Sequence, residues 1–142
     1  MKLIIGSDHG GYDLKEECKA YLKEKPDCSL EDIGVFSRDS SDYPIVAHKL
    51  SKAVIVGEYT FGILICGTGI GMSITANRHK GIRAALCHNL YTARMSRQHN
   101  DANILVMGGR VIGTGLAMEM LELFLSTRFE GDRHQRRLNQ ID

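Results

Sequence analysis

Short apolar runs rich in β-branched residues recur along the chain, separated by longer stretches with a helical period. Runs of about five or six residues, bounded by glycine or polar residues, are typical of buried strands. They predict five strands, at Lys2–Ser7, Leu30–Val35, Phe61–Cys66, Ile82–Cys87 and Ile104–Gly108. Because the runs are almost continuously apolar, we expect both faces of the sheet to be covered.

Helical periodicity fills the segments between these strands. Apolar residues at positions i, i+4, i+7 and i+8 form a stripe along one helix face. Three segments carry this spacing: Leu14, Cys18, Tyr21 and Leu22; Val46, Leu50, Ala53 and Val54; and Leu116, Met120, Leu123 and Phe124, which follow Thr114. Shorter helices are expected at Gly71–Arg78 and Leu90–Gln98. Asp42 and Asn89 are candidate N-caps of the helices that follow them.

The alternation of strand and helix predicts an α/β fold, a Rossmann-like three-layer α/β/α sandwich with a five-stranded parallel sheet. A crossover helix packs on the sheet whose strands it links, so we expect helices on both faces. The chain has 142 residues and no linker, repeat or low-complexity tract. Residues 1–142 are therefore expected to form a single domain, which ends in an arginine-rich tail, residues 128–142.

The composition narrows the possible partners. Hydrophobic residues make up 43% of the chain and charged residues 25%, and the formal net charge is +1. A nearly neutral chain has no general field that would attract nucleic acid or an anionic membrane. No apolar run approaches the roughly 18 residues of a membrane span, and the first residues enter a predicted strand instead of a signal peptide. We therefore expect a cytoplasmic location.

The spacing of cysteine and histidine argues against a metal centre. The four cysteines, Cys18, Cys28, Cys66 and Cys87, form no CxxC pair, and none of the six histidines lies in an HxH or HExxH motif. Structural zinc sites and redox motifs depend on such short spacings. We expect free thiols and no dedicated metal site.

Glycine is concentrated where the predicted strands end. Eight of the fifteen glycines lie at the ends of the first, third and fifth strands, in the segments 6–11, 67–71 and 108–109. In open parallel sheets the ligand binds beyond the carboxyl ends of the strands, where helix N-termini present unpaired N–H groups. The sequence therefore places the candidate site at this edge.

The segment Cys66-Gly67-Thr68-Gly69-Ile70-Gly71 is the most informative of the three. Its G-x-G-x-G spacing is not the dinucleotide-binding fingerprint, because Met72 stands where the third glycine belongs, and no Lys-Ser or Lys-Thr follows as in a Walker loop. One interpretation is a tight turn beside a buried cysteine. The other is chemical, since the N–H groups of a helix start favour a thiolate and can stabilise a developing oxyanion.

Two histidine segments also have two interpretations each. Asp8-His9 follows the first strand, where the pair can cap a helix or contact a ligand. His99-Asn100 ends the predicted helix Leu90–Gln98, where a histidine can compensate the helix dipole or take part in proton transfer.

Arginine is the third candidate group. Arg110 follows the fifth strand, and all four basic Lys/Arg residues of the tail 128–142 are arginines. Such a run can be a solvated face, but arginine also grips phosphate through two parallel hydrogen bonds. Arg133 and Arg137 are four residues apart and would share one face of a helical tail.

Taken in order, these segments resemble the type B ribose-5-phosphate isomerases, a family that also includes allose-6-phosphate and galactose-6-phosphate isomerases. The resemblance covers nearly the whole chain. It rests on the blocks 6–10, 41–44, 62–77, 81–86 and 99–103, and on Arg133-His134 with Arg137. The chain departs from the common pattern at Gly10-Gly11, where Ala-Ala is frequent, and at Ser41, where valine is frequent.

The resemblance implies the α/β/α fold and the interconversion of ribose 5-phosphate and ribulose 5-phosphate without a cofactor. It implies these roles: Cys66 as the base; Gly67, Thr68, Gly69, Ile70 and Gly71 as N–H donors to the enediolate; His99, helped by Thr68, in ring opening; Asp8, Asn100 and Tyr43 at the sugar; and His9, Arg110, Arg133 and Arg137 at the phosphate. The family's site lies between two subunits, which implies a homodimer or a dimer of dimers that binds a small sugar phosphate.

Two alternatives stay open. An isomerase of a hexose 6-phosphate, such as allose 6-phosphate, would need only a different distance between the thiol and the phosphate grip. A non-catalytic module that binds phosphosugars is the second alternative, because a fold alone does not establish activity.

Overall fold

A computed structural model describes residues 1–142 and contains one parallel sheet of five strands. The strands are β1 (Lys2–Ser7), β2 (Ser29–Asp32), β3 (Phe61–Cys66), β4 (Ala84–Leu86) and β5 (Ile104–Gly108). Their order across the sheet is β2-β1-β3-β5-β4. β1, β3 and β5, the three central strands, have the predicted bounds, and every pairing is parallel as predicted.

The two edge strands are shorter than predicted. β2 ends at Asp32 instead of Val35, because Gly34 has a φ of +97° and its N–H turns back to the Asp32 carboxylate, 2.9 Å away. β4 begins at Ala84 instead of Ile82 and ends one residue early, at Leu86. The Ile82 N–H is taken by the carbonyl of His79 and the Arg83 N–H by the Asn103 side chain, so neither joins a strand ladder.

Six α-helices connect or follow the strands: α1 (Tyr12–Lys23), α2 (Tyr43–Ile55), α3 (Ile70–Ala76), α4 (Leu90–Gln98), α5 (Thr114–Ser126) and α6 (Asp132–Leu138). The Asn89 side chain caps α4 by accepting from Thr92 N–H at 2.9 Å, as predicted. The cap predicted for Asp42 is wrong in part. Asp42 is the N-cap residue of α2, but its backbone carbonyl accepts from Ile45 and its carboxylate makes no capping bond.

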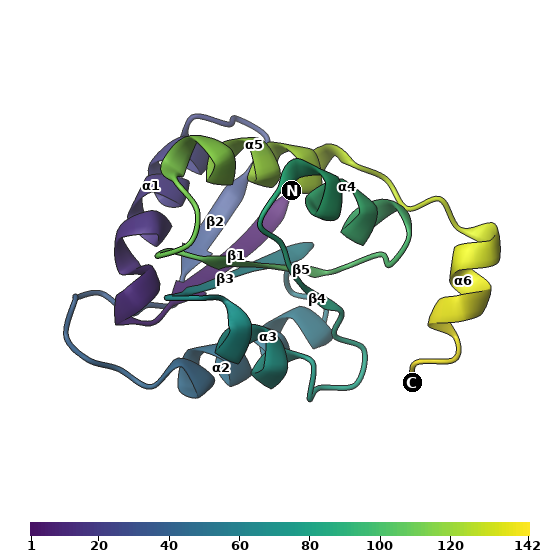
Figure 1. Cartoon of the computed structure of the whole chain (residues 1–142), viewed down its shortest axis with the longest axis horizontal. Helices are drawn as coiled ribbons and strands as arrows, with labels where there is room; N and C mark the ends of the chain where they lie inside the picture. The colour runs from purple at the N-terminus through teal and green to yellow at the C-terminus, as the bar shows by residue number, and fades with distance from the viewer.

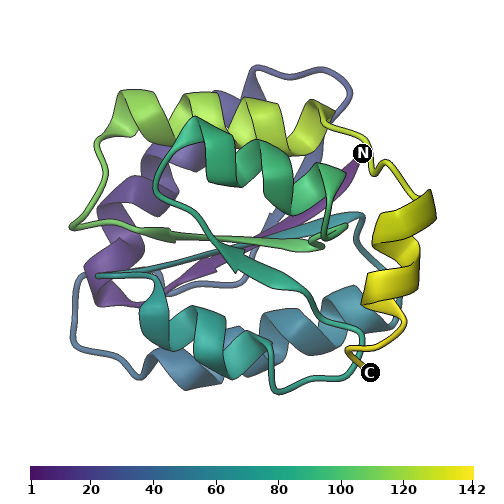
Figure 2. The same ribbon diagram turned by 45° about the vertical axis from the view of Figure 1, so that its right-hand side comes forward.

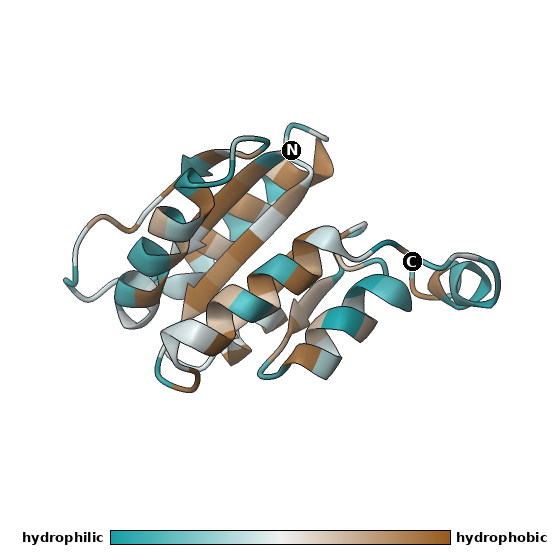
Figure 3. Ribbon diagram, turned by 90° about the horizontal axis from the view of Figure 1, so that it is seen from above, coloured by the Kyte–Doolittle hydropathy of each residue, from teal (hydrophilic) through white to brown (hydrophobic).

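The helices cover both faces of the sheet and make three layers. Figure 1 shows α1, α4 and α5 on one side and α2 and α3 on the other, and Figure 2 shows the same layers after a turn. Alternate strand residues feed the two cores. Leu3 and Ile5 pack under α1 and α5, whereas Ile4 packs under α2. Figure 3 shows apolar residues running along the strands, while much of the outer helix surface is hydrophilic.

The tail forms α6, which lies beside the end of the sandwich instead of on either face (Figures 1 and 2). A backbone bond from Glu130 N–H to the Gln98 carbonyl, 3.0 Å long, ties the tail to the end of α4. No helix of the structure combines the length and apolar character that a membrane crossing requires.

Candidate active site

The strand order places a topological switch point between β1 and β3. From β1 the chain passes to β2 on one side and then to β3 on the other, so the connections after β1 and β3 leave in opposite directions. Such a switch point is where open parallel sheets bind their ligands. Asp8 immediately follows β1, and Cys66 is the last residue of β3.

Three glycine-containing loops converge at this edge. A Cβ added to Gly10 would lie 3.0 Å from the Gly67 nitrogen, and one added to Gly109 would lie 2.8 Å from the Gly10 carbonyl oxygen. Gly109 N–H also donates to the Cys66 carbonyl at 2.8 Å, and Arg110 N–H donates to Gly67 at 2.9 Å. Side chains at these positions would keep the backbones apart, so glycine allows the loops after β1, β3 and β5 to meet.

The Cys66 thiol is held at the start of α3. Its Sγ accepts a hydrogen bond from Gly69 N–H at 3.1 Å, and Gly69 has a φ of +80°, a conformation that glycine adopts without strain. The Thr68 hydroxyl accepts from Ile70 N–H at 3.2 Å. Cys66 is only 4% exposed in the single chain. The buried position and the contact with a helix start are therefore both present in the structure.

Asp8 and His9 are held by their neighbours. The Asp8 carboxylate accepts from Gly11 N–H at 3.1 Å, which caps the short 3₁₀ turn His9–Gly11 as the capping interpretation predicted. His9 is half-buried, and its backbone and ring both contact Ser41. Local sequence spacing does not reveal this contact, because residues 9 and 41 meet only through the tertiary fold.

Tyr43 and Arg110 close the same edge. The Tyr43 ring lies against Gly71, since a Cβ there would be 2.6 Å from ring carbons. The Arg110 side chain lies across Gly67, with its guanidinium nitrogen 3.4 Å from the position of a Cβ. The structure thus brings one group of predicted residues together, which we call the thiol group: Asp8, His9, Tyr43, Cys66, Gly67, Thr68, Gly69, Ile70, Gly71 and Arg110.

The remaining predicted residues lie at the other end of the strands. α4 ends just before His99, and the Asn103 carbonyl accepts from Gly62 N–H near the start of β3. The five residues of β5 then span about 16 Å to the opposite edge, where Gly108 pairs with Cys66. We call this second set the histidine group: His99, Asn100, Arg133 and Arg137. One chain does not bring the two groups together.

Within the histidine group, the part of the tail that carries the two arginines is helical. Arg133 and Arg137 lie in α6, are exposed, and form no ion pair. His134, between them, is only 5% exposed and stacks on His99, with ring centroids 4.2 Å apart and an angle of 11° between the planes. Burial, together with the neighbouring His99 and Arg133, lowers the pKa of His134. The sequence showed His134 only as part of a motif and gave no sign of the stack.

His99, Glu130 and His134 also form the one cluster with metal-ligand side chains, their ligand atoms lying within 4.8 Å of one another. An imidazole coordinates a metal in the plane of its ring, about 2.0 Å from the nitrogen. Because the two rings are stacked and nearly parallel, their lone pairs do not converge on a common point. In this arrangement the cluster does not fit a metal ion.

The cavities of the chain lie away from the thiol. The largest, about 480 Å³, is bordered by β4, Asn100 and the last two residues, and another of about 400 Å³ lies between α4 and α5. Neither is lined by Cys66. The thiol group is therefore an open edge of this chain instead of an enclosed pocket.

Comparison with known proteins identifies the class. Residues 3–141 match the family model described as Ribose/Galactose Isomerase. The chain is 46% identical over 140 residues to ribose-5-phosphate isomerase B of Escherichia coli (strain K12), covering 99% of this chain and 93% of the relative. It is 47% identical over 133 residues to 4-deoxy-4-sulfo-D-erythrose isomerase of Clostridium sp. (strain MSTE9), covering 91% and 81%.

The fold is also similar to that of solved structures. The crystal structure of a ribose 5-phosphate isomerase from Thermotoga maritima matches with a TM-score of 0.97 and 52% sequence identity, over 99% of this chain and 97% of that one. These matches make the protein an isomerase that acts on sugar phosphates. The chain belongs to the ribose/galactose isomerase family, which confirms the resemblance and the predicted three-layer fold.

Proposed function

We propose that the protein interconverts ribose 5-phosphate and ribulose 5-phosphate through an enediolate. The observation that carries this proposal is the hydrogen bond from Gly69 N–H to the Cys66 thiol, at the switch point between β1 and β3. The choice of ribose 5-phosphate follows the names of the Escherichia coli and Thermotoga maritima relatives.

Cys66 acts as the base. A proton beside a carbonyl is removed readily only if the resulting oxyanion is stabilised, so a base and a set of N–H donors belong together. The Cys66 thiolate takes the proton from C2 of the open-chain aldose, and the electron pair forms the C1–C2 double bond while O1 becomes the oxyanion. N–H groups of the segment 67–71 stabilise that oxygen. The thiol then returns the proton to C1, and the proton of the O2 hydroxyl is transferred to O1, so that C2 becomes the ketone and O1 the C1 hydroxyl.

Residues of both groups prepare and hold the substrate. Ribose 5-phosphate is mostly cyclic in water, so an acid and base must expose its aldehyde, and histidine titrates in the useful range. We assign this step to His99, helped by Thr68. Asp8, Asn100 and Tyr43 hold the sugar, and His9, Arg110, Arg133 and Arg137 hold the phosphate, whose binding positions the reacting end.

The site is completed by a second copy of the chain. Cys66 and His99 lie at opposite ends of the strands, too far apart to act on one small sugar within one chain. Apolar side chains surround the thiol group and are exposed: Ile45 by 69%, Ile70 by 52%, Ile74 by 55% and Val111 by 53%. A two-fold dimer that covers this surface would bring the partner's histidine group to each thiol group.

An isomerase assay tests the proposal. Ribose 5-phosphate and allose 6-phosphate are compared by kcat/KM, each with and without a chelator. We expect conversion of ribose 5-phosphate that the chelator does not change. A clear preference for the hexose would overturn the substrate assignment, and the absence of turnover on either sugar would leave a phosphosugar-binding module.

A further inference from the structure

The segment between β2 and α2, residues 33–41, borders the loop that carries Asp8 and His9. Its first part continues along β1 after β2 has ended. Ser7 N–H donates to the Gly34 carbonyl at 2.7 Å, and Val35 N–H donates to the Ser7 carbonyl at 2.8 Å. The segment is therefore attached to β1 immediately before the site begins.

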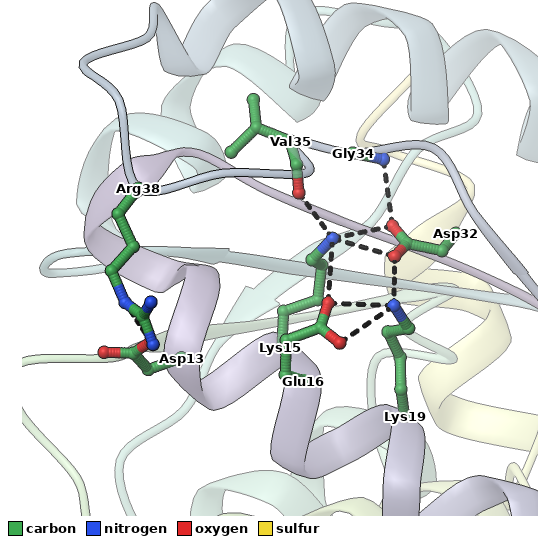
Figure 4. A network of polar contacts seen from close by, with 8 residues as sticks. All are labelled: Asp13, Lys15, Glu16, Lys19, Asp32, Gly34, Val35 and Arg38. Carbon is green, nitrogen blue, oxygen red and sulfur yellow. Dashed lines mark hydrogen bonds and ion pairs between the residues drawn. The ribbon is translucent and has the colours of Figure 1, made fainter.

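Lys15 anchors this segment from below (Figure 4). Its side chain is fully buried, and its Nζ donates to both Asp32 carboxylate oxygens at 2.8 Å and to the Val35 carbonyl at 2.6 Å. Asp32 in turn accepts from Gly34 N–H at 2.9 Å. A buried ammonium is stable only when its hydrogen bonds are satisfied, so Lys15 requires both partners at these positions.

The same contacts determine the charge state of Asp32. Partial burial by itself would raise the pKa of Asp32, but hydrogen bonds from Lys15 and Lys19 outweigh it and hold that pKa below its ordinary value. Lys19 lies 2.6 Å from the carboxylate. Asp32 is therefore ionised at neutral pH.

The far end of the segment holds His9. Ser41 N–H donates to His9 Nδ1 at 3.2 Å, and His9 N–H donates to the Ser41 hydroxyl at 3.1 Å. A backbone N–H only donates, so Nδ1 is the unprotonated nitrogen of the ring. The hydrogen of the neutral imidazole must then be on Nε2. Arg38 also pairs with Asp13 at 2.7 Å. Both side chains are about three-quarters exposed, so this ion pair contributes little to the stability of the segment.

We propose that the segment 33–41, anchored by Lys15, is a positioning device in which Ser41 holds the His9 ring in its Nε2–H form, as a neutral hydrogen-bond donor for an anionic ligand. Ser41 and Lys15 are positioning residues, because they act through His9. The assignment of the anion as the substrate phosphate rests on the proposed function. The tautomer of the His9 ring does not depend on the proposed function, and it can be measured without substrate.

Nitrogen NMR of the full chain, labelled at histidine, measures the form directly. The two imidazole nitrogens of His9 have distinct shifts in each tautomer, and a His9→Asn spectrum assigns them. We expect the Nε2–H tautomer above the titration range of histidine. A wild-type ring protonated on Nδ1 overturns the proposal, whatever substrate the enzyme uses.

Two proline variants test the role of Ser41. Ser41→Pro removes the N–H that donates to Nδ1, whereas the Ser40 N–H makes no hydrogen bond, so Ser40→Pro is the matched control. For Ser41→Pro we expect a mixture of His9 tautomers and a KM for ribose 5-phosphate raised about tenfold, with kcat changed much less. Ser40→Pro should resemble the wild type. A Ser41→Pro protein with the wild-type tautomer and KM contradicts the proposal.

The anchoring role of Lys15 is tested by removing both charges of the Lys15–Asp32 pair. Lys15→Met alone would leave Asp32 without its main partner, so the double variant Lys15→Met/Asp32→Asn is used, which leaves no buried charge unpaired. The control is Lys25→Met, which removes the Lys25–Glu122 pair just beyond the C-terminal end of α1. We expect the folded double variant to show the mixed tautomers of Ser41→Pro. A wild-type His9 spectrum in the double variant contradicts the anchoring role.

Discussion

The imidazole rings of His99 and His134 stack with centroids 4.2 Å apart and nearly parallel planes. His99 follows α4, and His134 lies in α6, so the contact joins the tail to the body of the molecule. Burial lowers the pKa of His134, so its ring is neutral at neutral pH. In this neutral form it packs against the ring of His99. The residue proposed to open the sugar ring is thus held by His134, for which the sequence pattern predicted no role.

The stack predicts how stability depends on pH. His134 has a lower pKa when folded than its ordinary value of 6.5, so near and below that value the unfolded chain binds more protons. The contribution of His134 to the free energy of unfolding is complete above about pH 6.5. It is lost as the pH falls from there through the pKa of the folded state. Urea unfolding at about pH 7.5 and about pH 5.5 measures this. The wild type should lose more stability over the interval than His134→Asn, and equal losses would contradict the assignment.

Mixing two inactive variants tests the shared site. If each site takes Cys66 from one chain and His99 from the other, a mixed dimer of Cys66→Ala and His99→Asn has one intact site and one site with both changes. Random exchange of equal amounts should restore about a quarter of wild-type activity. Recovery should require conditions that exchange subunits. If no activity returns although mass spectrometry shows mixed dimers, both residues act within one chain.

Arg137→Ala should raise KM for the sugar phosphate at least about tenfold, because a charge-assisted grip on the phosphate is lost while the thiol is untouched. Arg136→Ala is the control, since Arg136 is a neighbouring exposed arginine of α6 with no predicted role. Steady-state kinetics of the two variants decide the assignment. An unchanged KM for Arg137→Ala would remove that arginine from the phosphate site.

Gly71→Ala should lower activity without unfolding the protein. The new methyl group would lie 2.6 Å from the Tyr43 ring and displace it, while alanine favours the helix slightly. Gly115 offers a matched control, because it is likewise the second residue of a helix and has nothing within 4 Å of an added Cβ. We expect at least a tenfold loss of kcat/KM for Gly71→Ala and none for Gly115→Ala. Equal activity in the two variants would mean that Tyr43 does not contact the sugar.

The fold was predictable where hydrophobic pattern alone decides. β1, β3 and β5 are buried on both sides, so their apolar runs have the bounds of the strands. The edge strands are different, because their ends depend on side-chain hydrogen bonds and on a positive φ. Gly34 has a φ of +97° and its N–H donates to the Asp32 carboxylate, and the Asn103 side chain accepts from the N–H of Arg83. Such hydrogen bonds leave no periodic signal in the sequence.

The site was predictable to the extent that it follows strand ends. Glycines and Cys66 at three of these ends indicated the switch-point edge before the strand order was known. The separation of His99 from Cys66 follows from the direction of α4 and becomes visible only in the fold. The His9–Ser41 and His99–His134 contacts join residues more than thirty positions apart, so local spacing does not reveal them.

Proton transfer by Cys66 is the central claim, and deuterium transfer from solvent tests it most directly. Wild type, Cys66→Ala and, as control, Cys87→Ala are incubated with ribose 5-phosphate in D₂O, and deuterium at C1 of the ketose is measured. Cys87 is equally buried but lies outside the thiol group. We predict deuterium in the product of the wild type and of Cys87→Ala, and neither product nor deuterium with Cys66→Ala, which should still bind the sugar. A Cys66→Ala enzyme that forms deuterated ketose at the wild-type rate would contradict the account.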